Sequence, residues 1–309
     1  MLMRRENIRA GRGRFARVRT RLLGACLMAL GVAAPLAAAP QRVVSVNLCT
    51  DQLAMLLAAP GQLVSVSHLA ADPRASVMAR EAAGFRLNRG SAEDVYLMRP
   101  DLVLAGNYTT RFTVDLLRRL GIEVLELPPA TRLSDVPDQL RAVGRALGRE
   151  REAEARVAKF NEDLARLSAP SPRQPRAASY GPNGYTSGMR TMTDELFTAA
   201  GLRNIANDLG LEGGGMLAME RLVMAAPDLL VTSKTYAAAS RAEELLAHPA
   251  LAPLLSRAGR AVMSDADWVC GLPQILNALS GLVQARDALP PRDEEGSGGF
   301  ASPLAGDAE

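Results

Sequence analysis

The sequence predicts an α/β protein of two similar Rossmann-like lobes with parallel sheets, joined by one long rigid helix, with a ligand cleft between the lobes. Three observations lead to this prediction. Short apolar runs alternate with amphipathic stretches, a segment of the first half returns in the second half, and one charged helix separates the halves. At about 150 residues per domain, the 309 residues suffice for two lobes.

The first 39 residues predict a cleaved secretory signal peptide. Eight arginines precede residue 22, an apolar run covers 22–34, and small residues lead to Ala39. This run of about 13 residues is too short to cross a bilayer. Loss of residues 1–39 removes eight arginines and one glutamate, so the net charge changes from +3 to about −4. We expect an exported protein without a basic surface for nucleic acid.

The N-terminal lobe is expected over residues 40–148 and the C-terminal lobe over 176–288. Strands are predicted at 43–46, 63–66, 102–104 and 124–127 in the first lobe, and at 177–180, 229–231 and 261–263 in the second. A helix is expected from about Thr50, and helical stretches follow the strands of the second lobe. Strands that alternate with helices favour a parallel sheet.

The second lobe repeats part of the first. Residues 93–104 align without gaps on residues 220–231, and both segments have the pattern of a helix, a Pro-Asp pair and a strand. A looser match joins 117–124 to 255–262, with a glycine placed to close a helix before an edge strand in each. Helix, Pro-Asp and strand is also a common local solution, so chance similarity stays open. We interpret the two lobes as one unit used twice.

A linking helix and a Pro-rich connector are expected over residues 149–175. One apolar stripe runs along this otherwise charged helix, made of Ala153, Val157, Phe160, Leu164 and Leu167. The following Pro170 to Pro175 predicts a stiff connector. Residues 289–309 lack periodicity and predict a disordered tail.

The sequence holds none of the common catalytic motifs, neither a P-loop, a Gly-x-Ser-x-Gly elbow, a Cys-x-x-Cys pair nor a His-Glu-x-x-His pair. The chain has two histidines, His68 and His248, which are too few for a metal site of several imidazoles. We expect a protein that is not an enzyme and has no cofactor or metal site of its own. An exported α/β enzyme and a scaffold without a ligand remain the alternatives.

Four motifs in this order resemble the helical-backbone class (class III) of periplasmic substrate-binding proteins, over about residues 41–288. They are Arg42 to Asp51, the two Glu-x6-Pro-Asp-Leu repeats, Asn183 to Gly188, and Asp267 to Pro273. Members of this class feed ABC importers of cobalamin, ferric siderophores and haem. The expected Thr-Ser-Gly turn at 186–188 and the Asp-Trp pair at 267–268 are most similar to those of the cobalamin-binding members. The resemblance implies a monomer in the periplasm with an ABC permease and its ATPase as partners.

Candidate ligand-binding residues follow from where the strands end. Loops at the carboxyl ends of parallel strands converge on one edge of each sheet, where ligands bind. Trp268 fits a wall that stacks on a flat ligand, although a lone tryptophan also fits the core. The candidates are Asn47, Cys49, Thr50, His68, Leu69, Asn88, Arg89, Asn107, Tyr108, Tyr185, Lys234, Tyr236 and Trp268. Each also has a purely structural explanation, such as the capping of a helix by Asn47 or Thr50.

Two further pairs of residues are singled out. Glu93 and Glu220 occupy equivalent positions of the repeat, and the resemblance implies that they dock on arginines of the permease. Cys49 and Cys270 each stand at an expected cleft edge, 221 residues apart. A disulfide, two free thiols and soft ligation of a metal centre all remain open for this pair.

The expected ligand is a bulky metal chelate, with cobalamin first. The candidate residues are rich in Asn, Thr, Tyr and Trp and poor in clustered arginine, which suits a nearly neutral corrinoid better than a tri-anionic chelate. A ferric siderophore is the close alternative. Haem is the third, with Tyr108, Tyr185, Tyr236 or His68 as its axial ligand.

Overall fold

The computed structural model describes residues 38–168, 173–234 and 248–290. The predicted signal peptide up to residue 37, residues 169–172 of the connector, Tyr236 and residues 291–309 of the predicted tail lie outside this part of the chain. Within it, two parallel sheets flanked by helices confirm the predicted fold class.

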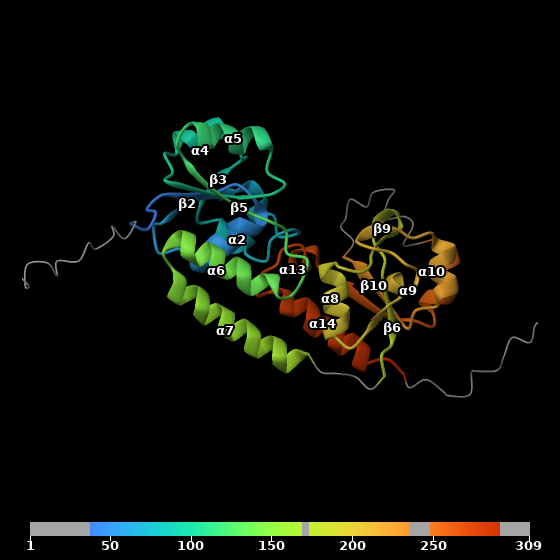
Figure 1. Ribbon diagram of the computed structural model, residues 1–309. Coiled ribbons are helices and arrows are strands. Elements are labelled where there is room, and N and C mark those ends of the chain that lie inside the picture. The colour runs from blue at the N-terminus through green and yellow to red at the C-terminus, as the bar shows by residue number, and fades with distance from the viewer. Residues whose placement is uncertain (1–37, 169–172, 235–247, 291–309) are drawn as a thin grey trace, which may run out of the picture. The chain divides into compact units, whose positions relative to one another are not determined.

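The first sheet has five parallel strands in the order β3-β2-β1-β4-β5. Their bounds are β1 (Val43–Ser45), β2 (Leu63–Ser67), β3 (Arg86–Asn88), β4 (Leu102–Gly106) and β5 (Glu123–Leu127). Figure 1 shows helices α4 and α5 on one face and α2 and α6 on the other. These helices are α2 (Leu48–Leu57), α4 (Ala92–Leu97), α5 (Arg111–Arg119) and α6 (Asp135–Leu147), and the short α3 (Ala79–Ala82) precedes β3.

Both faces of this sheet are buried, as expected for a parallel sheet. Val44 and Val103 pack toward α4 and α5, whereas Val43 and Leu104 belong to the core that includes α2 and α6. Helix α2 begins two residues earlier than predicted. Asn47 is its N-cap, and its side-chain Oδ1 accepts a hydrogen bond from the backbone N–H of Cys49 at 3.0 Å.

The second sheet has four parallel strands in the order β11-β10-β6-β8. They are β6 (Arg176–Ser179), β8 (Arg203–Asn204), β10 (Leu229–Ser233) and β11 (Gly259–Met263). A two-stranded antiparallel ribbon joins β7 (Tyr185–Ser187) to β9 (Gly214–Met216). The helices of this half are α8 (Met192–Ala199), α9 (Ile205–Asp208), α10 (Met219–Ala225), α12 (Ala252–Leu255), α13 (Asp265–Trp268) and α14 (Ile275–Asp287).

Helix α7 (Glu150–Leu167) is the predicted linking helix. Gly148, with φ of +67°, ends α6, and α7 then packs back against α6. The predicted apolar stripe faces the core, because Ala153, Val157 and Phe160 are buried while Leu164 and Leu167 are partly buried against them. Helix α14 packs on α7, and Leu289 after it also contacts the core, so the ordered chain extends past the predicted start of the tail.

The ungapped repeat forms the same structure twice, as α4–β4 in the first lobe and α10–β10 in the second. Val95 and Leu222 occupy equivalent positions and are both fully buried. The residue before each Pro-Asp pair has a positive φ, 50° at Arg99 and 44° at Ala226. The looser match holds less well, because Gly121 closes α5 with φ of +79° whereas Gly259 is the first residue of β11.

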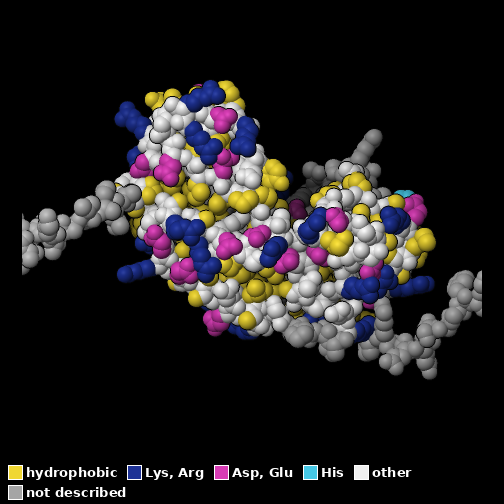
Figure 2. Space-filling view, in the orientation of Figure 1, with side chains coloured by type: hydrophobic (Ala, Val, Ile, Leu, Met, Phe, Trp, Pro, Cys, Tyr) yellow, Lys and Arg dark blue, Asp and Glu magenta, His cyan; other side chains and the backbone are white. Residues whose placement is uncertain are grey.

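Charges of both signs are interspersed on the face of the molecule shown in Figure 2, without a large patch of a single sign. In the part of the chain that the structure describes, no helix is long and apolar enough to cross a membrane.

Candidate functional site

A cavity of about 250 Å³ lies at the carboxyl ends of the first sheet. The chain passes from β1 outward to β2 and β3 and then crosses to β4 on the other side of β1. This crossing is a topological switch point, where the loops after β1 and β4 diverge and leave a crevice. The cavity is lined from these loops by Asn47, Cys49, Asn107 and Tyr108, and from the end of β5 by Leu127, Pro128, Pro129 and Ala130.

Asn47 is held against the end of β4. A Cβ atom on Gly106 would lie 2.9 Å from the Asn47 side-chain nitrogen Nδ2, so only glycine lets the two loops approach this closely. The Oδ1 atom of Asn47 caps α2, while its Nδ2 has no hydrogen-bond partner among the described residues. Asn47 therefore brings one amide donor to the cavity wall.

A second cavity, of about 370 Å³, occupies the equivalent place in the second lobe, where β6 and β10 are neighbours at the switch point of that sheet. It is lined by Ser179, Tyr180, Gly181, Pro182, Tyr185, Ser187, Thr193, Val231, Ser233, Asp265, Trp268 and Val269. Trp268 is half-buried, with one side packed on the core. It can therefore serve both as packing and as a wall of the cavity.

Tyr185 projects from the ribbon of β7 and β9, and half of its surface is exposed. Its position depends on a glycine across the ribbon, since a Cβ atom on Gly214 would fall on the phenol oxygen of Tyr185. The ribbon is tied to β6 by Thr186, whose hydroxyl donates to the backbone oxygen of Ser179 at 2.7 Å. Thr186 and Ser187, expected as part of a turn, instead belong to strand β7, and this strand places the aromatic side chain of Tyr185 at the rim.

Cys49 and Cys270 form a disulfide, with their Cα atoms 5.2 Å apart. Of the three alternatives for this pair, the structure has the first. The bond joins the first turn of α2 to the segment between α13 and α14. Val269, next to Cys270, lines both cavities. The disulfide thus fixes α2 to the residues at which the two cavities adjoin.

The linings of the two cavities are almost neutral. Neither contains a lysine or an arginine, and Asp265 is their single carboxylate.

A buried carboxylate, Asp51, lies in α2. It accepts hydrogen bonds from the Ser67 hydroxyl at 2.5 Å and from the Ser67 backbone N–H at 3.1 Å. Burial raises the pKa of Asp51 to about 6, against the lowering effect of these hydrogen bonds and of Ser45.

The predicted ligand residues divide by position. Asn47, Cys49, Thr50, Asn107 and Tyr108 line the first cavity, and Tyr185 and Trp268 line the second. The hydroxyl of Thr50 is within hydrogen-bond distance of the Ser45 hydroxyl and the Asn47 carbonyl, both inside the protein.

Other candidates lie away from both cavities. His68, Leu69 and Arg89 are exposed beyond β2 and β3, which lie across β1 from the switch point, and Lys234 is exposed at the end of β10. Asn88 is buried, and its Nδ2 donates to the Ser45 carbonyl at 2.8 Å and to the Ser65 hydroxyl at 2.9 Å. Because its Nδ2 joins β3 to β1 and β2 and its Oδ1 accepts the backbone N–H of Gly90, the Asn88 amide is occupied within the protein.

The apolar wall formed by residues 127–130 was not among the predicted site residues. Neither was Gln139, whose Nε2 donates to the Pro128 carbonyl at 2.7 Å. The strand ending at Leu127 had been predicted, so the same rule on strand ends applied to it would have found this wall. The same rule reaches Gly106 and Asp265, which follow the predicted strands 102–104 and 261–263. Gly214 carries no such signal, because its role depends on Tyr185 across the ribbon.

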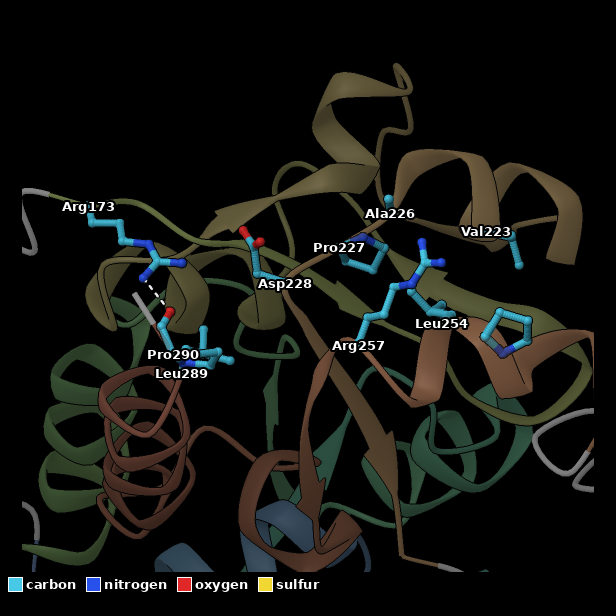
Figure 3. Close-up of a pocket in the computed structure, with 10 residues that line it drawn as sticks. Arg173, Val223, Ala226, Pro227, Asp228, Leu254, Arg257, Leu289 and Pro290 are labelled. Carbon is cyan, nitrogen blue, oxygen red and sulfur yellow. Dashed lines mark hydrogen bonds between the residues drawn. The ribbon is translucent and has the colours of Figure 1, made fainter. Parts of the chain in front are cut away.

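A third cavity, of about 320 Å³, lies at the opposite, amino end of the second sheet (Figure 3). Arg173 crosses one side and its Nη1 donates to the Pro290 carbonyl at 2.7 Å. Arg257 and Asp228 also border it, with an apolar wall that includes Pro227 and Leu254. Its place, away from the carboxyl ends of the strands, separates it from the two cavities above.

The two repeat glutamates lie on the surface. Glu93 is in the first turn of α4 and Glu220 in the first turn of α10, and both are exposed. Glu220 is close enough to Tyr180 for its charge to add to the effect of burial, and both raise the pKa of the Tyr180 phenol. Among the described residues neither glutamate forms an ion pair, and no group of three or more His, Cys, Asp or Glu side chains is arranged to hold a metal ion.

Comparison with known proteins gives one family. The family model described as "Periplasmic binding protein" matches residues 43–260, which is more than half of the chain. The chain belongs to this family. It is a family of binding proteins for transport and not of enzymes. Its members act outside the cytoplasm, and the fold described above is theirs.

Individual relatives differ in what they bind. A cobalamin-binding protein of Halobacterium salinarum is 30% identical over 198 residues, which cover 62% of this chain and 54% of that protein. The chain thus spans about half the length of the curated relatives it matches. An uncharacterized ABC transporter substrate-binding lipoprotein of Bacillus subtilis is 24% identical, over 63% of this chain and 64% of that protein.

Solved structures show the shared fold. The apo form of a periplasmic haem-binding protein from Roseiflexus sp. RS-1 has a TM-score of 0.66 at 22% identity, covering 79% of this chain and 98% of that one. The periplasmic vitamin B12 binding protein of Vibrio cholerae has a TM-score of 0.61 at 17% identity, covering 80% and 97%. These likenesses extend to proteins of different ligands and so support the fold alone.

Proposed function

We propose that this protein is the periplasmic substrate-binding protein of an ABC importer that captures a bulky metal chelate, cobalamin in the first place, and delivers it to the membrane permease. The observation that carries the proposal is the pair of cavities at equivalent switch points, which adjoin at Val269 beside the Cys49–Cys270 bond. The cobalamin-binding relative at 30% identity supports the ligand.

The size of the cavities favours a ligand held by both lobes. Cavities for drug-sized ligands measure about 300–1,000 Å³. The first cavity, at about 250 Å³, is smaller than this range, and the second, at about 370 Å³, is near its lower end. A corrinoid would therefore rest on both linings, with Asn47, Asn107 and Tyr108 on one side and Tyr185 and Trp268 on the other.

The chemistry of the linings favours a nearly neutral ligand decorated with amides. Amide and hydroxyl groups can exchange hydrogen bonds with such groups, and the rings of Tyr185 and Trp268 can pack on a flat macrocycle. A tri-anionic siderophore would need cationic side chains that neither lining provides. Binding and release are the whole function, and no bond in the ligand is made or broken.

Haem is the second candidate because both rims carry exposed tyrosines. Tyr108 is 83% exposed and Tyr185 is 50% exposed, and a phenolate oxygen is a known type of axial ligand for haem iron. His68 lies away from both cavities and is a weaker candidate for this role.

Calorimetric titration of the mature protein with cyanocobalamin, a ferric hydroxamate and haemin would test the proposal. We expect one-to-one binding of cyanocobalamin with a Kd in the nanomolar to low micromolar range. Binding of haemin alone, with an iron spectrum that changes in Tyr108→Phe or Tyr185→Phe, would favour the second candidate. Silence with all three ligands would refute the proposal.

A further inference from the structure

The two helices that carry the repeat glutamates also present matching apolar side chains to solvent. Leu97 in α4 is 75% exposed, and Met224 in α10 is 84% exposed. Both stand four residues after the glutamate of their helix, and the same 127 residues separate Leu97 from Met224 as separate Glu93 from Glu220. Residues four apart share one face of a helix, so each lobe displays a carboxylate with a large apolar side chain one turn away.

Packing within the lobes accounts for other parts of the repeat but not for this pair. Val95 and Leu222 recur because they fill the cores. Leu97 and Met224 touch neither core and line neither of the two cavities. A large apolar side chain that recurs at an outward position in both lobes points to a contact outside the molecule.

We infer that Leu97 and Met224 are paired apolar docking contacts that insert into two equivalent sockets of the membrane permease, each socket holding a cationic side chain for Glu93 or Glu220. This inference rests on the proposed function. A duplicated surface unit fits a partner with two-fold symmetry, which presents the same socket twice. Protein interfaces have an apolar core and a polar, charged rim, and a leucine or methionine one turn from a carboxylate supplies both parts.

A second copy of this chain fits the same surface less well. In a two-fold interface between copies, the same patches face one another. Such an interface would bring the glutamates of the two chains into one patch, and neither glutamate has an ion-pair partner among the described residues to offset its charge. Like charges at an interface disfavour association, so the sockets must belong to a partner that supplies positive charge.

The test compares docking variants on the permease–ATPase complex of the source organism whose ATPase activity the wild-type protein stimulates, reconstituted in nanodiscs. We expect the double variant Leu97→Ala with Met224→Ala to bind this complex about tenfold or more weakly, at low and at high salt alike. For Glu93→Gln with Glu220→Gln, the loss should be largest at low salt and fade as salt rises. Both double variants should keep the thermal stability and the calorimetric ligand affinity of the wild type, because all four side chains are exposed and lie outside the cavities.

Two controls make the test specific. Phe112→Ala removes a side chain that is 72% exposed on α5 but has no counterpart in the repeat, and should dock as the wild type does. The double variant Leu97→Met with Met224→Leu conserves the apolar volume at both positions, so it should dock as the wild type does. Normal docking by the alanine pair, with loss in the glutamine pair, would overturn the inference and leave the proposed function standing. Normal docking by both pairs would refute permease docking at these helices altogether.

Discussion

The carboxylate of Asp101 accepts the backbone N–H of Arg42 at 2.9 Å, immediately before β1. Asp228 does the same for Arg176, the first residue of β6, at 2.8 Å. In each lobe the aspartate of the Pro-Asp pair thus ties the start of the central strand to the start of its neighbour, β4 or β10. The recurring Pro-Asp pair is therefore explained by strand registration, while the exposed glutamates of the same repeat are not.

This relationship predicts the effect of removing the carboxylate. Asp101 also accepts the backbone N–H of Gln41 at 2.7 Å, so Asp101→Ala leaves two backbone donors without their partner. We expect the free energy of unfolding to fall by about 1–2 kcal/mol. Chemical denaturation would measure it, with Asp115→Ala, an exposed aspartate on α5, as the control that should change little. Equal stability of the two variants would contradict the role of Asp101.

Asp51 predicts a pH dependence of stability. Its pKa of about 6 in the folded protein lies above its ordinary value of 3.8, so the folded state binds the proton more tightly than the unfolded state. The stabilisation from the protonated group is complete below about pH 4 and is lost as the pH rises through about 6. At 1.36 kcal/mol per pKa unit, the loss is roughly 3 kcal/mol at neutral pH.

The variant Asp51→Asn removes this titration. We expect its free energy of unfolding, relative to the wild type, to rise by roughly 3 kcal/mol between pH 4 and pH 7. Denaturant unfolding of both proteins at a series of pH values provides the measurement. A difference that stays constant with pH would mean that Asp51 is not the titrating group.

Gly214 predicts an indirect effect on binding. A methyl group there would collide with the phenol oxygen of Tyr185, which lies at the end of a movable side chain, so the ring should swing away while the fold persists. We expect Gly214→Ala to weaken ligand binding several-fold with little change in melting temperature. Gly215→Ala is the matched control, because its nearest neighbour would be Leu211 at 3.7 Å. Equal ligand affinities of the two variants would argue against Tyr185 as a contact.

The Cys49–Cys270 disulfide should be detectable by the absence of free thiols and by its contribution to the free energy of unfolding. Non-reduced protein should contain no alkylatable thiol in its mature chain, which mass spectrometry would check. The two cysteines are 221 residues apart in the sequence, so the bond closes a long loop. Disulfides of this kind stabilise the folded state by about 2–5 kcal/mol. The double variant Cys49→Ser with Cys270→Ser should lose that amount. Two free thiols in the oxidised protein would rule the bond out.

The sequence predicted those parts of the fold whose cause is local. Buried parallel strands such as β1, β4 and β10 are continuous apolar runs, and the stripe of α7 has a helical period. The strands β8 and β9 have two and three residues, and β9 contains Gly214 and Gly215, so no apolar pattern marks them. They form because neighbouring elements offer an edge to pair with, and this is a tertiary effect.

The candidate site divides in the same way. Asn47, Tyr108 and Trp268 were found because strand ends converge at one edge of a parallel sheet. The order of the strands along the sheet was not available from the sequence. Because β2 and β3 lie across β1 from β4, His68 and Arg89 lie away from the switch point, whereas Pro128 and Pro129 line the cavity there. Asn88 was expected at a strand end facing the ligand, but it is buried at the end of β3, where its amide donates hydrogen bonds to β1 and β2.

A ligand that rests on both lobes should depend on an exposed tyrosine from each. Tyr108 lies at the first cavity and Tyr185 at the second, and each can be truncated without opening the core. The measurement is calorimetric titration of cyanocobalamin into the wild type, Tyr108→Ala and Tyr185→Ala. We expect one-to-one binding throughout, with affinity reduced in both variants. A ligand affinity that responds to only one tyrosine, or no binding to the wild type, would contradict the account.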